Sequence, residues 1–432
     1  MGMRRLRIAA LGTAAAVLSG CYWSQPGFDA GGSGFNKNES ELTTANVSSL
    51  VETWTATLDD GSAAAIVQSS AGSFHVADAA GVYALDPATG ARQWRTPVAG
   101  LAGIETYPLG RGDLVVPTID PGATPNGQLV RLDAGTGAVI ESLPSAGKIT
   151  PGTEELHTAR SGDWVVTVYS SYWADFTCMC PIGETSVSVT DLADPARSWD
   201  WSFNPYTSGF LWTALTNPVI IGDRFYVGEW VSRRNAMNPG EAIPVSANLA
   251  GWDLADPCTS ACAPDYRVEY PGEEITSPGI AAAPDRTAVA VGIGDGLRAV
   301  DLATGTTAWT TDTSYSWVAP TWTPDGVFSV RSYPEDRLAA YPAGGCAGPC
   351  TPSWTTPLPG DPVGQASAAG DLVFVGTADG TVAAYPSSCT EGCTPVWSVH
   401  LGSAITAPPI VTQGRVVVGT ADGRVVAFGL PR

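Results

Sequence analysis

Residues 81–94 read GVYALDPATGARQW and residues 296–309 read GLRAVDLATGTTAW, so the two stretches share one pattern. Alternating apolar residues run to an Asp, a Thr-Gly pair follows, and a second short stretch ends on Trp. A third copy at residues 127–140, GQLVRLDAGTGAVI, keeps the Asp and the Thr-Gly but ends on Ile. Alternation with period two on both sides of a glycine turn is typical of a β-hairpin, so each stretch predicts strand, turn and strand.

The full repeat is longer than one hairpin. GDLVFVGTADGTVAAY at residues 370–385 and GRVVVGTADGRVVAF at residues 414–428 are a second pair of similar hairpins, 43 residues apart. Trp309, Trp354 and Trp397 recur at intervals of 45 and 43 residues. This period matches one four-stranded blade of a β-propeller.

Four strands per repeat divide the chain into seven blades, at residues 62–99, 100–145, 148–205, 208–271, 273–313, 314–359 and 360–401. Residues 403–430 supply three more strands, and VETWTATL at residues 51–58 has the Trp-ended pattern of a fourth. Pairing these two ends in one blade closes the ring and removes its exposed edges. We therefore expect an all-β fold, an eight-bladed β-propeller of four-stranded antiparallel blades whose last blade is closed by the N-terminal strand.

The N-terminus has the features of an exported lipoprotein. Three arginines within the first seven residues precede an apolar run that is too short for a membrane span and ends at Leu18-Ser19-Gly20-Cys21. This tetrapeptide resembles the bacterial lipobox, although an ordinary signal peptide with an incidental cysteine is the alternative. We expect a lipoprotein signal peptide at residues 1–20, a lipid on Cys21 at the outer face of the cell membrane, a flexible tether rich in Gly, Ser and Asn at residues 21–40, and the propeller at residues 41–432.

The charge of the chain narrows the class of partner. Without the three signal-peptide arginines, 19 Lys and Arg stand against 42 Asp and Glu, a net charge of −23. Such a surface repels nucleic acid and anionic lipid, so neither is an expected partner. No motif for nucleotide, phosphate or nucleophilic chemistry stands out.

Eight cysteines remain after Cys21, an even number in a chain expected in an oxidising compartment. Six of them form C-x3-C pairs, which are Cys258 with Cys262, Cys346 with Cys350, and Cys389 with Cys393. We expect each pair to close a local disulfide in an outer hairpin; zinc is the alternative, but no histidine lies beside a pair. Cys178 and Cys180 are one residue apart, so a bridge between them would be strained, and whether they pair stays open.

The motif of an apolar strand, Ala-x-Asp, Thr-Gly and a terminal Trp resembles the pyrroloquinoline-quinone (PQQ)-type propeller repeat, and the resemblance covers nearly the whole mature chain. In that family the terminal Trp docks between neighbouring blades. By position this implies a buried role for Trp54, Trp94, Trp309, Trp354 and Trp397, with Trp199 or Trp201 as a sixth.

The family holds both quinone-dependent dehydrogenases and non-catalytic binding propellers. The dehydrogenases use a vicinal disulfide against the quinone, a bound calcium and a catalytic Asp, whereas this chain has no Cys-Cys pair. Asp86, Asp133 and Asp301 belong to the repeat turns, where Asp caps the backbone. We therefore expect no enzyme, no cofactor and no metal site, and the chain resembles the branch that includes the lipoprotein scaffold of the outer-membrane barrel-assembly machinery.

Three adjacent blades have an expanded loop between their second and third strands, at residues 118–127, 170–185 and 229–248. Since consecutive turns of a blade alternate between faces, these loops share one face of the ring. Aromatic side chains with paired arginines are typical anchors of a recognition surface, although the loops could instead bury these rings as local caps. The candidate binding-face residues are Tyr172, Trp173, Trp212, Trp230, Arg233, Arg234 and Trp317.

The sequence therefore favours a non-catalytic cell-envelope lipoprotein, a propeller scaffold that binds an envelope protein or a cell-wall polymer through one face and the membrane through its lipid anchor. Two alternatives stay open. One is a PQQ-type quinoprotein oxidoreductase, and the other is a carbohydrate-binding sensor module that stacks sugar rings on the aromatic rim.

Overall fold

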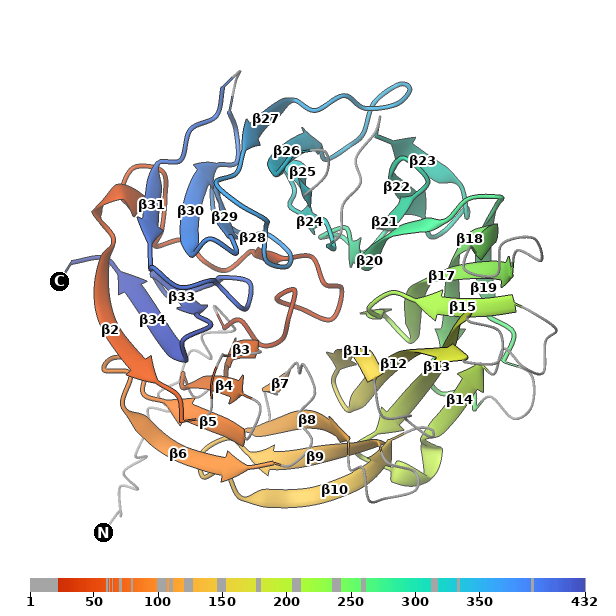
Figure 1. Ribbon diagram of the computed structural model, residues 1–432, viewed down its shortest axis with the longest axis horizontal. Coiled ribbons are helices and arrows are strands. Elements are labelled where there is room, and N and C mark those ends of the chain that lie inside the picture. Colours follow the sequence, from red (N-terminus) through yellow and green to blue (C-terminus); the bar gives the residue numbers. More distant parts are fainter. Residues whose placement is uncertain are drawn as a thin grey trace, which may run out of the picture.

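The computed structural model is a ring of eight β-sheets around a central channel (Figure 1). It describes residues 22–431 except for residues 60, 62, 64, 70–71, 79–80, 99–106, 109–111, 120–126, 146–152, 176–179, 204–210, 235–241, 258–261, 312–317, 332–334 and 390–391. The two described helices are single 3-10 turns, η1 (Val47–Ser49) and η2 (Pro195–Arg197). Within the described residues, no helix is long and apolar enough to cross a membrane.

In each blade the strands follow one another from the channel outward. Blade 1 contains β3 (Ala65–Gln68), β4 (Phe74–Asp78), β5 (Gly81–Leu85) and β6 (Arg92–Pro97). Blade 2 contains β7 (Tyr107–Pro108), β8 (Asp113–Ile119), β9 (Gly127–Asp133) and β10 (Val139–Ser145). Blade 3 contains β11 (Thr153–Ser161), β12 (Trp164–Asp175), β13 (Cys180–Asp191) and β14 (Trp199–Phe203).

Blade 4 has a divided innermost strand, β15 (Leu211–Leu215) and β16 (Val219–Ile221), followed by β17 (Arg224–Arg234), β18 (Ala242–Asp253) and β19 (Tyr266–Pro271). Blade 5 contains β20 (Ile275–Ala282), β21 (Ala288–Ile293), β22 (Gly296–Asp301) and β23 (Thr307–Thr310). Blade 6 contains β24 (Thr321–Trp322), β25 (Gly326–Arg331), β26 (Arg337–Pro342) and β27 (Trp354–Pro357).

Blade 7 contains β28 (Ser367–Ala369), β29 (Leu372–Gly376), β30 (Thr381–Pro386) and β31 (Trp397–His400), with the short strand β1 (Phe35–Asn36) added parallel to β28. Blade 8 contains β32 (Ile410–Thr412), β33 (Arg415–Gly419) and β34 (Arg424–Gly429). Its outer strand is β2 (Val51–Thr57), which pairs antiparallel with β34. The predicted eight blades and their closure by an N-terminal strand are both confirmed.

Six of the eight outer strands carry a Trp that packs against the next blade, whereas β10 and β19 have none. In β2, Trp54 alone is buried and its indole donates a hydrogen bond to the Pro87 carbonyl of blade 1 at 3.0 Å. The same donation to the next blade recurs from Trp94 to Ala134, from Trp199 to Leu254 and from Trp354 to Ser387. Trp309 packs edge-on against Trp322 of blade 6, and Trp397 against Phe428 of blade 8.

The turns of the blades define two faces of the ring. The innermost strand of each blade runs from one face to the other, so the first and third turns of a blade lie on one face and the second turn on the opposite face. Disulfides Cys346–Cys350 and Cys389–Cys393 lie in the third turns of blades 6 and 7. We call that side the disulfide face, and we call the side with the second turns, including the long hairpins β12–β13 and β17–β18, the hairpin face.

Candidate functional site

The N-terminal segment at residues 22–40 lines the inside of the ring (Figure 1). Its bond to the end of β3 places its start at the disulfide face. The carbonyl of Trp23 accepts a hydrogen bond from the amide of Gln68, the last residue of β3, at 2.8 Å. The Gln25 side chain bonds both the amide and the carbonyl of Arg160, near the end of β11. The segment is thereby attached to blades 1 and 3 within its first four described residues.

The same segment continues around the channel from blade to blade. Four of its backbone carbonyls accept hydrogen bonds of 2.6–2.8 Å from backbone amides of the inner strands of blades 4, 5, 6 and 7. The acceptors are Ala30, Gly31, Ser33 and Gly34, and the donors are, in the same order, Ile220, Ala282, Trp322 and Ala368. Asn36 then donates to the Val411 carbonyl of blade 8 at 2.8 Å. Seven of the eight blades therefore bond the segment directly.

This packing differs from the flexible tether that the sequence predicts at residues 21–40. The glycines serve close turns, since a Cβ on Gly27 would lie 2.8 Å from the Cα of Gly32. Trp23 and Phe28 pack edge-on with ring centroids 5.4 Å apart and are 2% and 5% exposed. The inner strands of the blades have free edges whose amides need acceptors, and the segment supplies them.

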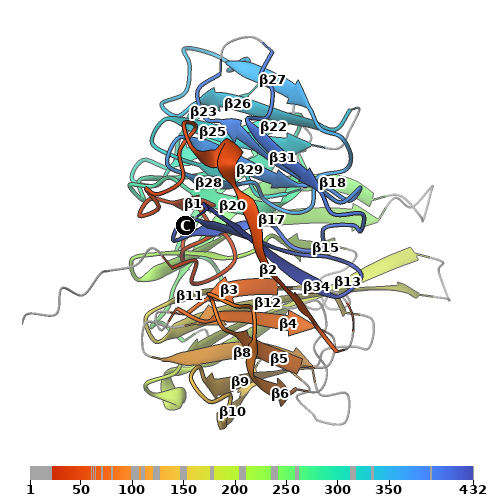
Figure 2. The same ribbon diagram turned by 90° about the vertical axis from the view of Figure 1, so that its left-hand side faces the viewer.

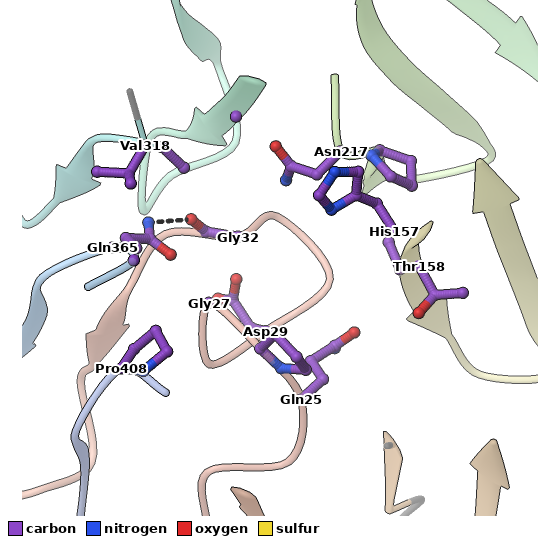
Figure 3. Close-up of a pocket in the computed structure, with 16 residues that line it drawn as sticks. Gln25, Gly27, Asp29, Gly32, His157, Thr158, Asn217, Val318, Gln365 and Pro408 are labelled. Atoms are coloured by element: carbon purple, nitrogen blue, oxygen red, sulfur yellow. Dashed lines mark hydrogen bonds between the residues drawn. The ribbon is translucent and has the colours of Figure 1, made fainter. Parts of the chain in front are cut away.

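A cavity of about 250 Å³ lies in the channel against this segment (Figure 3). Several of its lining residues come just before the inner strands β16, β24, β28 and β32, which places the cavity on the hairpin-face side of the segment. The lining residues are Gln25, Pro26, Gly27, Asp29, Gly32, His157, Thr158, Ala159, Asn217, Pro218, Gly279, Val318, Ala319, Gly364, Gln365 and Pro408.

Several polar side chains of the cavity hold its wall together. Asp29 accepts from the amides of Gly31 and Ser33 and from the Arg286 guanidinium at 2.6 Å. The Gln365 amide donates to the carbonyls of Gly32 and Pro320 at 2.8 and 2.7 Å, and Figure 3 shows the first of these bonds.

Asn217 joins blade 4 to blade 5, because its side-chain oxygen accepts from the Ile280 amide at 2.8 Å. The ionisable side chains among the described lining are Asp29 and His157, and the lining contains no Lys or Arg. No group of three or more potential metal-ligating side chains lies together in the described part of the chain. The cavity thus suits a small neutral polar molecule or water.

Five of the seven candidate binding-face residues lie on the two long hairpins of the hairpin face, whereas Trp212 lies on the inner strand β15 and Trp317 lies outside the described residues. Tyr172 and Trp173 lie in β12, opposite Gly183 and Ile182 of β13. Most of each region that the sequence suggests as a loop, residues 170–185 and 229–248, is paired strand, because the ladder of the blade continues into it.

Strand β17 of the second hairpin, which carries Arg233 and Arg234, pairs with β15, which carries Trp212. Trp212 of β15 lies opposite Ser232, and its neighbour Leu211 lies opposite Arg233 of β17, while Arg234 lies opposite Ala242 of β18. Strand β15 also packs against β13, so the hairpins of blades 3 and 4 stand side by side, and Figure 2 shows β13 reaching out on one side of the ring.

An ion pair between a buried carboxylate and an exposed guanidinium supports the base of the second hairpin. Glu229 is 5% exposed, its carboxylate lies 2.6 Å from the Arg267 guanidinium, and it accepts a hydrogen bond from Asn248 at 2.9 Å. Burial raises the pKa of Glu229, and the charge of Arg267 opposes that shift. Trp230, the next residue, is half-buried.

Some residues that the sequence singled out lie outside the described part of the chain, namely Cys21, Cys178, Cys258 and Trp317. Sequence reasoning missed the channel residues Gln25, Asp29, Asn217 and Gln365. The two rings of Trp23 and Phe28 in a segment otherwise rich in glycine were the signal that it packs rather than extends.

Comparisons with known proteins agree with the fold. The family model described as outer membrane protein assembly factor BamB matches residues 38–171 and 294–429. No curated protein sequence matches the chain significantly.

Three solved structures show the same architecture at low identity. BamB from Moraxella catarrhalis is 15% identical with a TM-score of 0.56, over 88% of this chain and 99% of that one. Quinohemoprotein alcohol dehydrogenase ADHIIG from Pseudomonas putida HK5 is 13% identical with a TM-score of 0.66, over 96% and 81%. The Dos1 propeller is 13% identical with a TM-score of 0.58, over 89% and 95%.

Proposed function

The chain belongs to the BamB family of PQQ-type β-propellers, and we propose that it is a non-catalytic envelope lipoprotein that binds a protein or polymer partner. The partner docks on the hairpin face, over the paired hairpins of blades 3 and 4. The lipid on Cys21 attaches the protein to the outer face of the cell membrane.

The observation that carries this proposal is the length of the two adjacent hairpins. Strands β12, β13 and β18 have 12 residues each and β17 has 11, whereas the second and third strands of the other described blades have 5 to 7. At about 3.3 Å per residue, the extra residues add roughly 20 Å of paired strand on one side of the ring. The ion pair of the buried Glu229 with Arg267 supports the base of one hairpin, and a surface ordered before binding loses less entropy when it binds.

Photo-crosslinking in intact cells tests the binding face. We expect crosslinkers at Trp173 and Arg233 to capture one discrete partner, identified by mass spectrometry. A crosslinker at the exposed Ala347 on the disulfide face is the matched control and should not capture it. Charge reversal by Arg233→Glu and Arg234→Glu should weaken the capture, and unchanged binding in that double variant would contradict the proposal.

A carbohydrate-binding module is the second candidate, because Tyr172 and Trp173 lie on the hairpin of blade 3 and Trp212 lies on β15, which packs against β13 of that hairpin. Aromatic faces stack on sugar rings. Capture of cell-wall polymer alone in the crosslinking experiment, together with binding on a glycan array that Trp173→Ala abolishes, would favour this candidate over the protein scaffold.

The described lining of the channel cavity does not favour a quinoprotein oxidoreductase. A metal-bound quinone carboxylate needs cationic and carboxylate partners, but the described lining has no Lys or Arg and its one carboxylate, Asp29, already bonds Gly31, Ser33 and Arg286. The N-terminal segment also fills the disulfide-face end of the channel. The visible spectrum of the purified protein tests this point, since a quinone absorption band would overturn it.

A further inference from the structure

The first described residues place the start of the mature chain on one face of the ring. Trp23 bonds Gln68, which ends the inner strand of blade 1 and therefore lies at the disulfide face. Figure 2 shows β1 and the start of β2 on one side of the ring and the outer end of β13 on the other. The N-terminal attachment and the long hairpins thus lie on opposite faces.

The chain has almost no slack between Cys21 and the propeller. Cys21 is two positions before the buried Trp23. Since consecutive Cα atoms are about 3.8 Å apart, the Cα atoms of these two residues are separated by less than about 8 Å. Trp23 is 2% exposed and Gln25 is 7% exposed. The Gln25 side chain donates a hydrogen bond to the Arg160 carbonyl and accepts one from the Arg160 amide. Extending this segment into a tether would break its bonds to seven blades and expose two aromatic rings.

From these contacts we infer that a lipid on Cys21 holds the propeller in one orientation, with the disulfide face against the lipid surface and the hairpin face directed away from it. This inference rests on the proposed lipidation of Cys21. The hairpin face then stands off the membrane by at least the height of a blade, roughly 20 Å for a strand of six residues, and is free for a partner.

Quenching of a fluorophore on lipid vesicles tests the orientation. The mature chain, with Cys178 and Cys180 replaced by Ser, is coupled through Cys21 to a thiol-reactive phospholipid in phosphatidylcholine vesicles that contain a headgroup nitroxide lipid. A fluorescent amino acid replaces either Ala347 on the disulfide face or Ala378 in the second turn of blade 7; both alanines are exposed. We expect several-fold stronger quenching at position 347 than at position 378.

A linker variant controls for the short attachment. Twenty Gly-Ser residues inserted between Cys21 and Tyr22 span about 25 Å on average, which lets the ring tumble and should remove most of the difference between the two positions. Equal quenching at both positions without the linker, or stronger quenching at position 378, would overturn the inference.

The chemical coupling separates this inference from the proposed function. Lipidation in cells is tested independently, by mass spectrometry of the N-terminal peptide and by membrane fractionation of wild type against Cys21→Ser. Absence of the lipid in cells would refute the lipoprotein proposal and with it the orientation in the cell, whereas a lipidated protein with equal quenching would refute the orientation alone.

Discussion

Gly90 lies at the contact between blades 8 and 1, where the ring closes, and its replacement by Ala should lower the free energy of unfolding for two separable reasons. Its φ of 69° is in the left-handed region, where an L-residue costs about 1–2 kcal/mol. A Cβ at this position would also lie 2.5 Å from Cε3 and 2.8 Å from Cδ2 of Trp54, which docks from blade 8. Forcing a packed ring aside costs typically about 1–3 kcal/mol.

Gly305 supplies a matched control within the same chain. It ends the same Ala-Thr-Gly turn with a φ of 68°, and its amide bonds the Asp301 carbonyl at 2.9 Å, as that of Gly90 bonds Asp86 at 2.9 Å. Its Cβ would meet nothing closer than Val268 at 3.6 Å, because blade 4 has no docking Trp there. Gly305→Ala should therefore lose about 1 kcal/mol from the backbone alone.

Urea unfolding of the two variants measures the difference. We expect Gly90→Ala to lower the free energy of unfolding by about 2–4 kcal/mol, which is about 1–3 kcal/mol more than Gly305→Ala. In a Trp54→Ala background, Gly90→Ala should cost no more than Gly305→Ala does, because the ring that it displaces is gone. Equal losses for the two single variants, or an unchanged cost of Gly90→Ala without Trp54, would refute the docking argument.

Three further predictions follow from buried groups. Burial lowers the pKa of His75 to about 3, so the folded protein holds this side chain in its neutral form. The free energy of unfolding should be highest above pH 6.5 and should fall on acidification, by about 2 kcal/mol between pH 7 and pH 5. In urea titrations, His75→Leu should flatten this pH dependence. Gln25→Ala leaves the backbone of Arg160 without its two bonds and should cost about 2 kcal/mol in the same assay, whereas a loss below measurement would mean that the segment does not bind the ring. Replacing Cys346 and Cys350 by Ala opens a loop of sequence separation 4, so unfolding should become easier by about 2 kcal/mol with the fold retained in circular dichroism, and a collapse of the fold would show a larger role for the bridge.

The repeats were enough to predict the ring because each blade is specified locally. The Asp, Thr-Gly and terminal Trp of residues 81–94 and 296–309 encode a turn and a docking strand that need only the neighbouring blade. The closure by residues 51–58 was also predictable, since an incomplete last blade needs one more strand and the chain offers one with the right Trp. The two C-x3-C bridges at Cys346 and Cys389 are likewise local in sequence.

The packing of the N-terminal segment inside the ring could not be predicted from the sequence. Gly, Ser and Asn over residues 22–40 resemble a flexible tether, yet the segment accepts hydrogen bonds from backbone amides of seven blades that are far apart in the sequence. These amides converge only when the ring has closed, so no local pattern reveals them. The channel cavity, lined by Asp29, Asn217 and Gln365, exists for the same reason.

By itself the sequence determined the all-β class, the number of blades, the Trp of most outer strands and which blades have an expanded segment between their second and third strands, because these follow from alternation and turns within about 45 residues. Only the tertiary structure decided which face holds the N-terminus, what fills the channel and that the hairpins of blades 3 and 4 stand together. These depend on closing the ring, which brings the inner strands of distant blades around one axis and leaves their free edges to be satisfied by a segment that no repeat encodes.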